Sequence, residues 1–109
     1  MSAVRLILCT FPDEATAARV GQRLVEERLA ACVNLLPNAR SIYRWQGSVE
    51  TAHEVLALIK TAAERLPDLE QRLLALHPYE VPEILVLEPA HVSSAYQSWL
   101  LESVVSEQK

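Results

Sequence analysis

Residues 31–61, ACVNLLPNARSIYRWQGSVETAHEVLALIKT, decide the fold, because they indicate two long strands joined by one tight turn. Residues 31–45 are rich in β-forming side chains, and Pro37-Asn38 marks a bend or an edge bulge within them. Gln46-Gly47 is the turn, since glycine adopts the positive φ that tight hairpins require. The chain then returns as a second strand over residues 49–61. The segment therefore predicts a β-hairpin with strands about twice the usual length.

A strand and a helix are predicted before this hairpin. Residues 4–10 form a nearly continuous apolar run, which is typical of a central strand buried on both faces. Pro12 and Asp13 end the strand, and the Asp13 side chain can cap a following helix of about four turns. The apolar stripe of that helix comprises Ala17, Val20, Leu24 and Val25.

After the hairpin the pattern predicts helix, strand and helix. Residues 64–76 carry leucines at positions 66, 69, 73 and 76 on one helical face, and the helix ends at His77-Pro78. Residues 81–87 form the next strand, with Pro82 at its entrance. Ser93 or Ser94 caps the last helix. The apolar face of this helix comprises Tyr96, Trp99, Leu100 and Val104.

The predicted element order, β-α-β-β-α-β with an extra C-terminal helix, is that of a ferredoxin-like α+β fold. Residues 1–109 suffice for one such domain. Two helices would cover one face of a four-stranded antiparallel sheet in which the first strand lies between the third and fourth. Cys9 and Cys32 then lie on non-adjacent strands, so we expect two free thiols rather than a disulfide.

The long hairpin also predicts an oligomer. Its distal half must extend beyond the two helices, so Tyr43 and Trp45 would face water and leave an exposed strand edge. Pairing with identical neighbours removes this edge. A closed ring, in particular a trimer whose sheets meet edge to edge, is the expected assembly.

Composition excludes several classes of function. The net charge is −4, and the ten Lys and Arg residues never form a run of four, which argues against binding to nucleic acid or to an anionic membrane. The apolar stretch of residues 4–11 is too short to span a bilayer and lacks the features of a signal peptide. We therefore expect a cytoplasmic protein.

The segment His77-Pro78-Tyr79-Glu80-Val81-Pro82-Glu83 is the densest cluster of functional side chains. It combines an imidazole, a phenol and carboxylates in a proline-stiffened loop, which favours a metal or small-molecule site with His77 as a ligand. Alternatively, the prolines only stiffen the connection and His77 only caps the helix C-terminus.

Cys9 is the other candidate metal ligand. A thiol and an imidazole are donors that suit copper or zinc better than magnesium or calcium. Two ligands do not complete a site, so carboxylates, Cys32, water or a neighbouring subunit would have to supply the rest. His53 and His91 are further candidates, although a lone histidine is more often a surface or packing residue.

No enzymatic motif is present. The apolar setting of Cys9 predicts a raised thiol pKa, which argues against a nucleophilic cysteine. The segment from Thr10 to Glu14 is acidic and lacks the glycine and arginine of a phosphate-binding loop. We therefore expect a binding protein and not an enzyme.

The chain resembles the CutA family of divalent-cation tolerance proteins over nearly its whole length. The segments that carry the resemblance are CTFPDEA at 9–15, ERLAACVN at 27–34, SIYRWQG at 41–47 and HPYEVPE at 77–83. The resemblance implies a trimer similar to the P-II signal-transduction proteins, and copper binding by Cys9 and by His77. Some members carry a second histidine immediately before the one that matches His77, and this chain has Leu76 at that position.

Two functional hypotheses follow. The first is a homotrimer that binds copper or another divalent cation through His77 and Cys9, with no metal needed for folding. The second is a P-II-like regulatory or scaffold trimer that binds a small molecule or a partner protein in its inter-subunit clefts. The side chains expected to line these clefts are Tyr43, Trp45, Lys60, Tyr79, Glu80 and Glu83.

Overall fold

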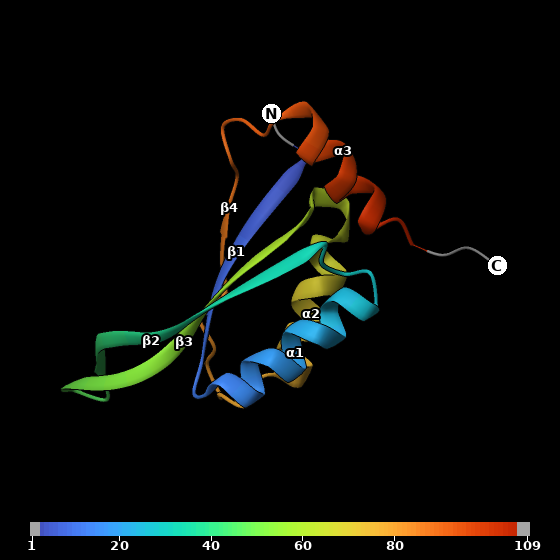
Figure 1. Ribbon diagram of the computed structural model, residues 1–109. Helices are drawn as coiled ribbons and strands as arrows, with labels where there is room; N and C mark the ends of the chain where they lie inside the picture. Colours follow the sequence, from blue (N-terminus) through green and yellow to red (C-terminus); the bar gives the residue numbers. More distant parts are fainter. Residues whose placement is uncertain (1–2, 107–109) are drawn as a thin grey trace.

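The computed structural model describes residues 3–106 as one four-stranded sheet with three α-helices (Figure 1). The strands are β1 (Val4–Phe11), β2 (Cys32–Trp45), β3 (Ser48–Ala62) and β4 (Leu85–Leu87). The helices are α1 (Glu14–Glu26), α2 (Leu66–Leu76) and α3 (Ser94–Ser103), and a short 3₁₀ helix, η1 (Ala63–Arg65), leads into α2.

The sheet is antiparallel with strand order β2-β3-β1-β4, so β1 lies between the third and fourth strands as predicted. Val4 pairs with Ala62, and Phe11 pairs with Val55. Cys9 on β1 and Cys32 on β2 are separated by β3, and both are free thiols.

The hairpin of β2 and β3 has the predicted length, turn and bulge. Its strands contain 14 and 15 residues. Gln46 and Gly47 both have positive φ, 50° and 84°. This combination is required by a two-residue hairpin turn whose twist matches that of the flanking strands. The register shifts between Leu36 and Ala39, where Asn38 has a φ of 64°. The distal half projects away from the helices (Figure 1).

Helices α1 and α2 cover one face of the sheet (Figure 1). Asp13 caps α1, since its carboxylate accepts the Thr16 N–H at 2.7 Å. On α2, Leu69 and Leu73 are fully buried, as their spacing predicts. Val25 is 40% exposed and does not join the buried stripe of α1, where Gly21 takes its place. Gly21 packs against Val33, which a Cβ at residue 21 would meet at 3.2 Å.

Two predicted elements differ from the structure. The fourth strand begins at Leu85 and not at Val81, because residues 81–84 do not pair with β1 and Pro82 has no N–H to donate to a sheet ladder. Leu100 on α3 and Val104 at its C-cap are buried, whereas Tyr96 and Trp99 of the same predicted apolar face are 39% and 48% exposed. Ser93 takes the N-cap position of α3, but its side chain makes no capping hydrogen bond.

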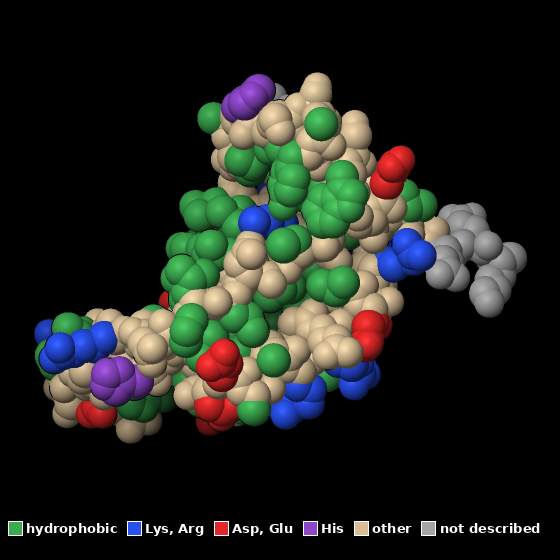
Figure 2. Space-filling view, viewed as in Figure 1, with side chains coloured by type: hydrophobic (Ala, Val, Ile, Leu, Met, Phe, Trp, Pro, Cys, Tyr) green, Lys and Arg blue, Asp and Glu red, His purple; other side chains and the backbone are tan. Residues whose placement is uncertain are grey.

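The sheet face opposite α1 and α2 is apolar and largely uncovered within residues 3–106. On β1, Ile7 and Cys9 face the helices and are fully buried, while Leu6 and Leu8 point the other way and are only partly buried. The prediction that β1 is buried on both faces is therefore wrong for the single chain. The register places a set of leucines on this open face, namely Leu6, Leu8, Leu36, Leu56, Leu58, Leu85 and Leu87. Hydrophobic side chains accordingly gather over the sheet beside β4 (Figure 2).

Candidate functional site

His77 lies at the C-cap of α2 and binds the end of β1. Its Nε2 lies 2.8 Å from the carbonyl oxygen of Thr10, and its Nδ1 lies 3.1 Å from the backbone nitrogen of Tyr79. Because the Tyr79 N–H donates to Nδ1, the proton of a neutral ring must be on Nε2, which donates to Thr10. The ring also stacks on Phe11, with centroids 4.5 Å apart. Both ring nitrogens are therefore engaged in hydrogen bonds.

The surroundings of His77 favour its neutral form. The side chain is buried, and this burial lowers its pKa, although the hydrogen bond to Thr10 and the nearby Glu54 carboxylate act in the opposite direction. A neutral imidazole is the form that can bind a metal ion. In this geometry, however, a metal ion would have to replace one of the two hydrogen-bond partners.

Cys9, which directly precedes Thr10 in the chain, contacts the same carbonyl. Its Sγ lies 3.9 Å from the Thr10 carbonyl oxygen, and the residue is fully buried in the core beneath α1 and α2. The pKa of the thiol is raised to about 12, chiefly by burial and further by the nearby carboxylates of Glu83 and Glu54. The thiol is therefore protonated at neutral pH.

The remaining metal-ligand candidates lie apart. Cys32 is on β2 beside Asn34, and His53 and His91 are both exposed. Within residues 3–106, no three His, Cys, Asp or Glu side chains come close enough together to hold a metal ion. Cys9 and His77 are thus the one predicted pair that the fold brings to a shared atom.

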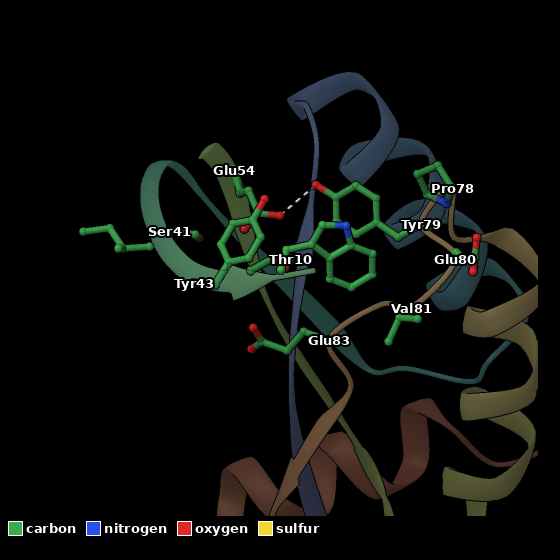
Figure 3. A pocket seen from close by; sticks show the side chains of 11 residues that line it. Thr10, Ser41, Tyr43, Glu54, Pro78, Tyr79, Glu80, Val81 and Glu83 are labelled. Atoms are coloured by element: carbon green, nitrogen blue, oxygen red, sulfur yellow. Dashed lines mark hydrogen bonds between the residues drawn. The ribbon is translucent and has the colours of Figure 1, made fainter. Parts of the chain in front are cut away.

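A pocket of about 720 Å³ lies between the distal half of the hairpin and the loop that follows His77 (Figure 3). Its volume is typical of small-molecule sites. Tyr43 and Glu54 lie across the pocket from Pro78, Glu80 and Val81 (Figure 3). The residues that line it are Thr10, Ser41, Ile42, Tyr43, Trp45, Glu54, Pro78, Tyr79, Glu80, Val81 and Glu83.

A hydrogen bond between Tyr79 and Glu54 joins the two walls of the pocket. The Tyr79 O–H donates to Oε2 of Glu54 at 2.7 Å (Figure 3). Burial raises the pKa of the phenol, and the Glu54 carboxylate raises it further, both by accepting the hydroxyl proton and by its charge. Tyr79 is therefore a fixed hydrogen-bond donor, and this contact ties the loop to β3.

Five of the six predicted cleft residues line this pocket, and Lys60 does not. Lys60 lies toward the other end of the sheet, where its Nζ is 2.6 Å from Oδ1 of Asn34 and 5.9 Å from the ring centre of Tyr96 on α3. Sequence reasoning missed Glu54 as a pocket residue. Its place on the open face, in alternation with Leu56 and Leu58, could have indicated it, but only once the hairpin register is known.

Among residues 3–106, no helix is both long and apolar enough to cross a membrane.

Comparison with known proteins gives a consistent result over most of the chain. The chain is 49% identical over 98 residues to the divalent-cation tolerance protein CutA of Thermus thermophilus. The aligned region covers 90% of this chain and 95% of that protein. The crystal structure of CutA from Xylella fastidiosa matches 95% of this chain and all of that one, with a TM-score of 0.92 and 43% identity. The periplasmic divalent cation tolerance protein CutA of Archaeoglobus fulgidus matches 94% and 99% of the two chains, with a TM-score of 0.90 and 31% identity.

Residues 5–103 also match the family described as CutA1 divalent ion tolerance protein. Apart from Val4, this match spans the four strands and the three α-helices of the described residues. Together with the identity to curated relatives, it shows that the chain belongs to the CutA1 divalent ion tolerance family.

Proposed function

We propose that this protein binds a copper-type divalent cation and acts in metal tolerance as a homotrimer of ferredoxin-like subunits. The observation that carries the proposal is the convergence of Cys9 and His77 on the Thr10 carbonyl, at 3.9 and 2.8 Å. A thiol and an imidazole at one strand end suit copper better than they suit a hard cation. Membership of a divalent ion tolerance family supports the same function.

Metal binding at this position requires local rearrangement. His77 must exchange a backbone hydrogen bond for the metal, and Cys9 must lose a proton although its pKa is about 12. Glu54 and Glu83 lie close enough to raise that pKa, so their carboxylates are the nearest candidates for a third ligand. Because binding displaces a proton, affinity should increase with pH.

Calorimetric titration of the assembled protein with Cu²⁺ tests this proposal. We expect binding that strengthens between about pH 6 and about pH 8 and is lost in His77→Ala and in Cys9→Ala. His91→Ala, which removes an exposed histidine, is the control and should bind as the wild type does. Absence of micromolar binding, or wild-type binding by His77→Ala, would contradict the proposed ligands.

The open face of the sheet supports the trimer. Seven leucines share this face, and Leu36, Leu85 and Leu87 among them are 43%, 52% and 43% exposed in the single chain. A contiguous apolar surface of this kind marks a protein interface. Association of copies around a threefold axis would cover the leucines and the exposed edge of β2 together.

A second candidate function is that of a P-II-like regulatory or scaffold trimer that binds a small molecule or a partner protein. The pocket beside Tyr79 favours it, because its volume suits a small molecule and its walls come from the hairpin and the loop. A ligand screen by thermal shift would test this function. Stabilisation by a ligand should disappear when Tyr43 and Tyr79 are replaced by Ala.

We place the protein in the cytoplasm, and this placement is supported by the two unpaired cysteines, which a reducing compartment preserves. We also assign it a binding role and no catalytic one. A protonated, buried Cys9 supports this assignment, because it cannot serve as a nucleophile at neutral pH.

A further inference from the structure

The pocket between the hairpin and the loop combines carboxylates with aromatic rings. Glu54, Glu80 and Glu83 line it together with Tyr43, Trp45 and Tyr79, and the remaining lining residues carry no charge. Neither Lys, Arg nor His contributes to its wall. The pocket therefore bears an excess of negative charge next to aromatic surfaces.

The carboxylates of this pocket make no ion pairs in the part of the chain that the structure describes. The contact that Glu54 makes is with the neutral hydroxyl of Tyr79, and none of the ion pairs within residues 3–106 includes Glu54, Glu80 or Glu83. A positively charged group that entered the pocket would therefore be attracted by unpaired charges.

The arrangement favours an organic cation over a bare metal ion. Within residues 3–106, no three of the Glu, Asp, His and Cys side chains come together into a group that could hold a metal ion. Aromatic faces, in contrast, attract an ammonium or guanidinium head and also pack against an apolar body. A volume of about 720 Å³ leaves room for such a molecule.

We propose that this pocket binds a small organic cation, with an ammonium or guanidinium head held by Glu83 and Glu54 and an apolar body packed against Tyr43, Trp45 and Tyr79. The inference deepens the second candidate function, on which it rests, by naming the chemical class of the ligand.

Three probes of similar shape and different charge test the inference on the assembled protein. They are protonated 2-phenylethylamine, neutral 2-phenylethanol and anionic 3-phenylpropionate, each titrated into ¹⁵N-labelled protein and followed by amide chemical shifts. We expect the cation to bind about tenfold or more tightly than the alcohol, and the anion not to bind. The shifts should centre on residues 41–45 and 78–83, and added salt should weaken binding.

A charge-removing variant and a matched control complete the test. Glu83→Gln should weaken binding of the cation by about three- to tenfold and leave binding of the alcohol unchanged. Glu70→Gln removes an exposed carboxylate on α2, outside the pocket, and should have no effect. Because Glu83 makes no hydrogen bond or ion pair with another described residue, its replacement should not impair folding.

The outcomes separate this inference from the function on which it rests. If the alcohol or the anion binds as tightly as the cation, the ligand class is wrong but the pocket remains a ligand site. If none of the three probes binds, and the thermal-shift screen also finds no ligand, both the inference and the second candidate function fail. Equal weakening by Glu70→Gln and Glu83→Gln would likewise overturn the inference, because it would reflect only the net charge of the protein.

Discussion

At the scale of single residues, His77 links burial to pH. Because burial lowers its pKa in the folded protein, the unfolded chain binds a proton at a higher pH than the folded chain does. The stability contributed by neutral His77 is therefore fully present above about pH 6.5, the value for an unperturbed histidine. It should decrease as the pH falls through the lower pKa of the folded state, with a slope of at most about 1.4 kcal/mol per pH unit.

Urea unfolding of the wild type and of His77→Gln at a series of pH values measures this effect at fixed protein concentration. Between about pH 7 and about pH 5, the free energy of unfolding should decrease less for the variant than for the wild type. His91→Gln, which alters an exposed histidine, should retain the wild-type profile. Parallel profiles for all three proteins would show that His77 does not titrate on unfolding.

The hydrogen bond from Tyr79 to Glu54 gives a second prediction at this scale. Tyr79→Phe keeps the ring but removes the donor, and Glu54, which is partly exposed, can recover hydration. We expect a loss of about 1 kcal/mol in the free energy of unfolding, since the bond involves a charged acceptor but is not deeply buried. Chemical denaturation measures it. The control is Tyr96→Phe, whose hydroxyl makes no hydrogen bond within residues 3–106, and an equal loss there would contradict the assigned role.

At the scale of elements, the hairpin turn depends on two residues with positive φ. Gly47 has a φ of 84°, and a Cβ added there would meet nothing within 4 Å, so Gly47→Ala tests backbone strain alone. We expect this substitution to lower the free energy of unfolding by about 1 kcal/mol. Gln46 has a φ of 50°, and Asn is the residue that this turn favours at such a position. Gln46→Asn should therefore raise the free energy of unfolding by roughly a few tenths of a kcal/mol.

Thermal unfolding of both variants measures these opposite changes. Equal effects of Gly47→Ala and Gln46→Asn would show that the turn does not limit the stability of the hairpin. The test is matched, because the two substitutions lie at adjacent positions of the same two-residue loop between β2 and β3.

The same elements show which parts of the fold could be predicted from sequence. The turn, the bulge at Asn38 and the cap at Asp13 depend on local backbone chemistry, and each was predicted correctly. The start of β4 was not, because strand pairing depends on which residues of β1 remain available, and Leu85 is the first residue of the segment that pairs. The exposure of Trp99 on the predicted apolar face of the last helix could not be predicted either, because helical periodicity does not reveal which part of a short helix meets the sheet.

At the scale of the whole molecule, the candidate site depends on tertiary contacts that sequence patterns do not contain. Proximity of Cys9 and His77 could be predicted only from the family resemblance. The contact of Cys9 with the Thr10 carbonyl is local, whereas that of His77 depends on the tertiary fold, which brings the end of α2 to the end of β1. Lys60 is predicted to line an inter-subunit cleft, and in the single chain it lies outside the pocket beside Tyr79. Its actual position toward α3 follows from the register, in which it pairs with Leu6 and Cys32 far from the bulge.

The proposed trimer gives the last prediction, which concerns the open face of the sheet. Leu85 on β4 and Leu74 on α2 are 52% and 51% exposed in the single chain, so replacing either with Glu should cost the isolated subunit a similar, small amount of stability. Leu85 shares the open face with Leu8, whereas Leu74 lies on a helix that covers the opposite face. A carboxylate at residue 85 would have to be buried between subunits, where an unpaired charge is strongly unfavourable. We therefore expect sedimentation velocity to show a trimer for the wild type and for Leu74→Glu, and a smaller species for Leu85→Glu that retains its secondary structure by circular dichroism. A wild-type monomer, or an intact trimer in Leu85→Glu, would show that this face is not the interface.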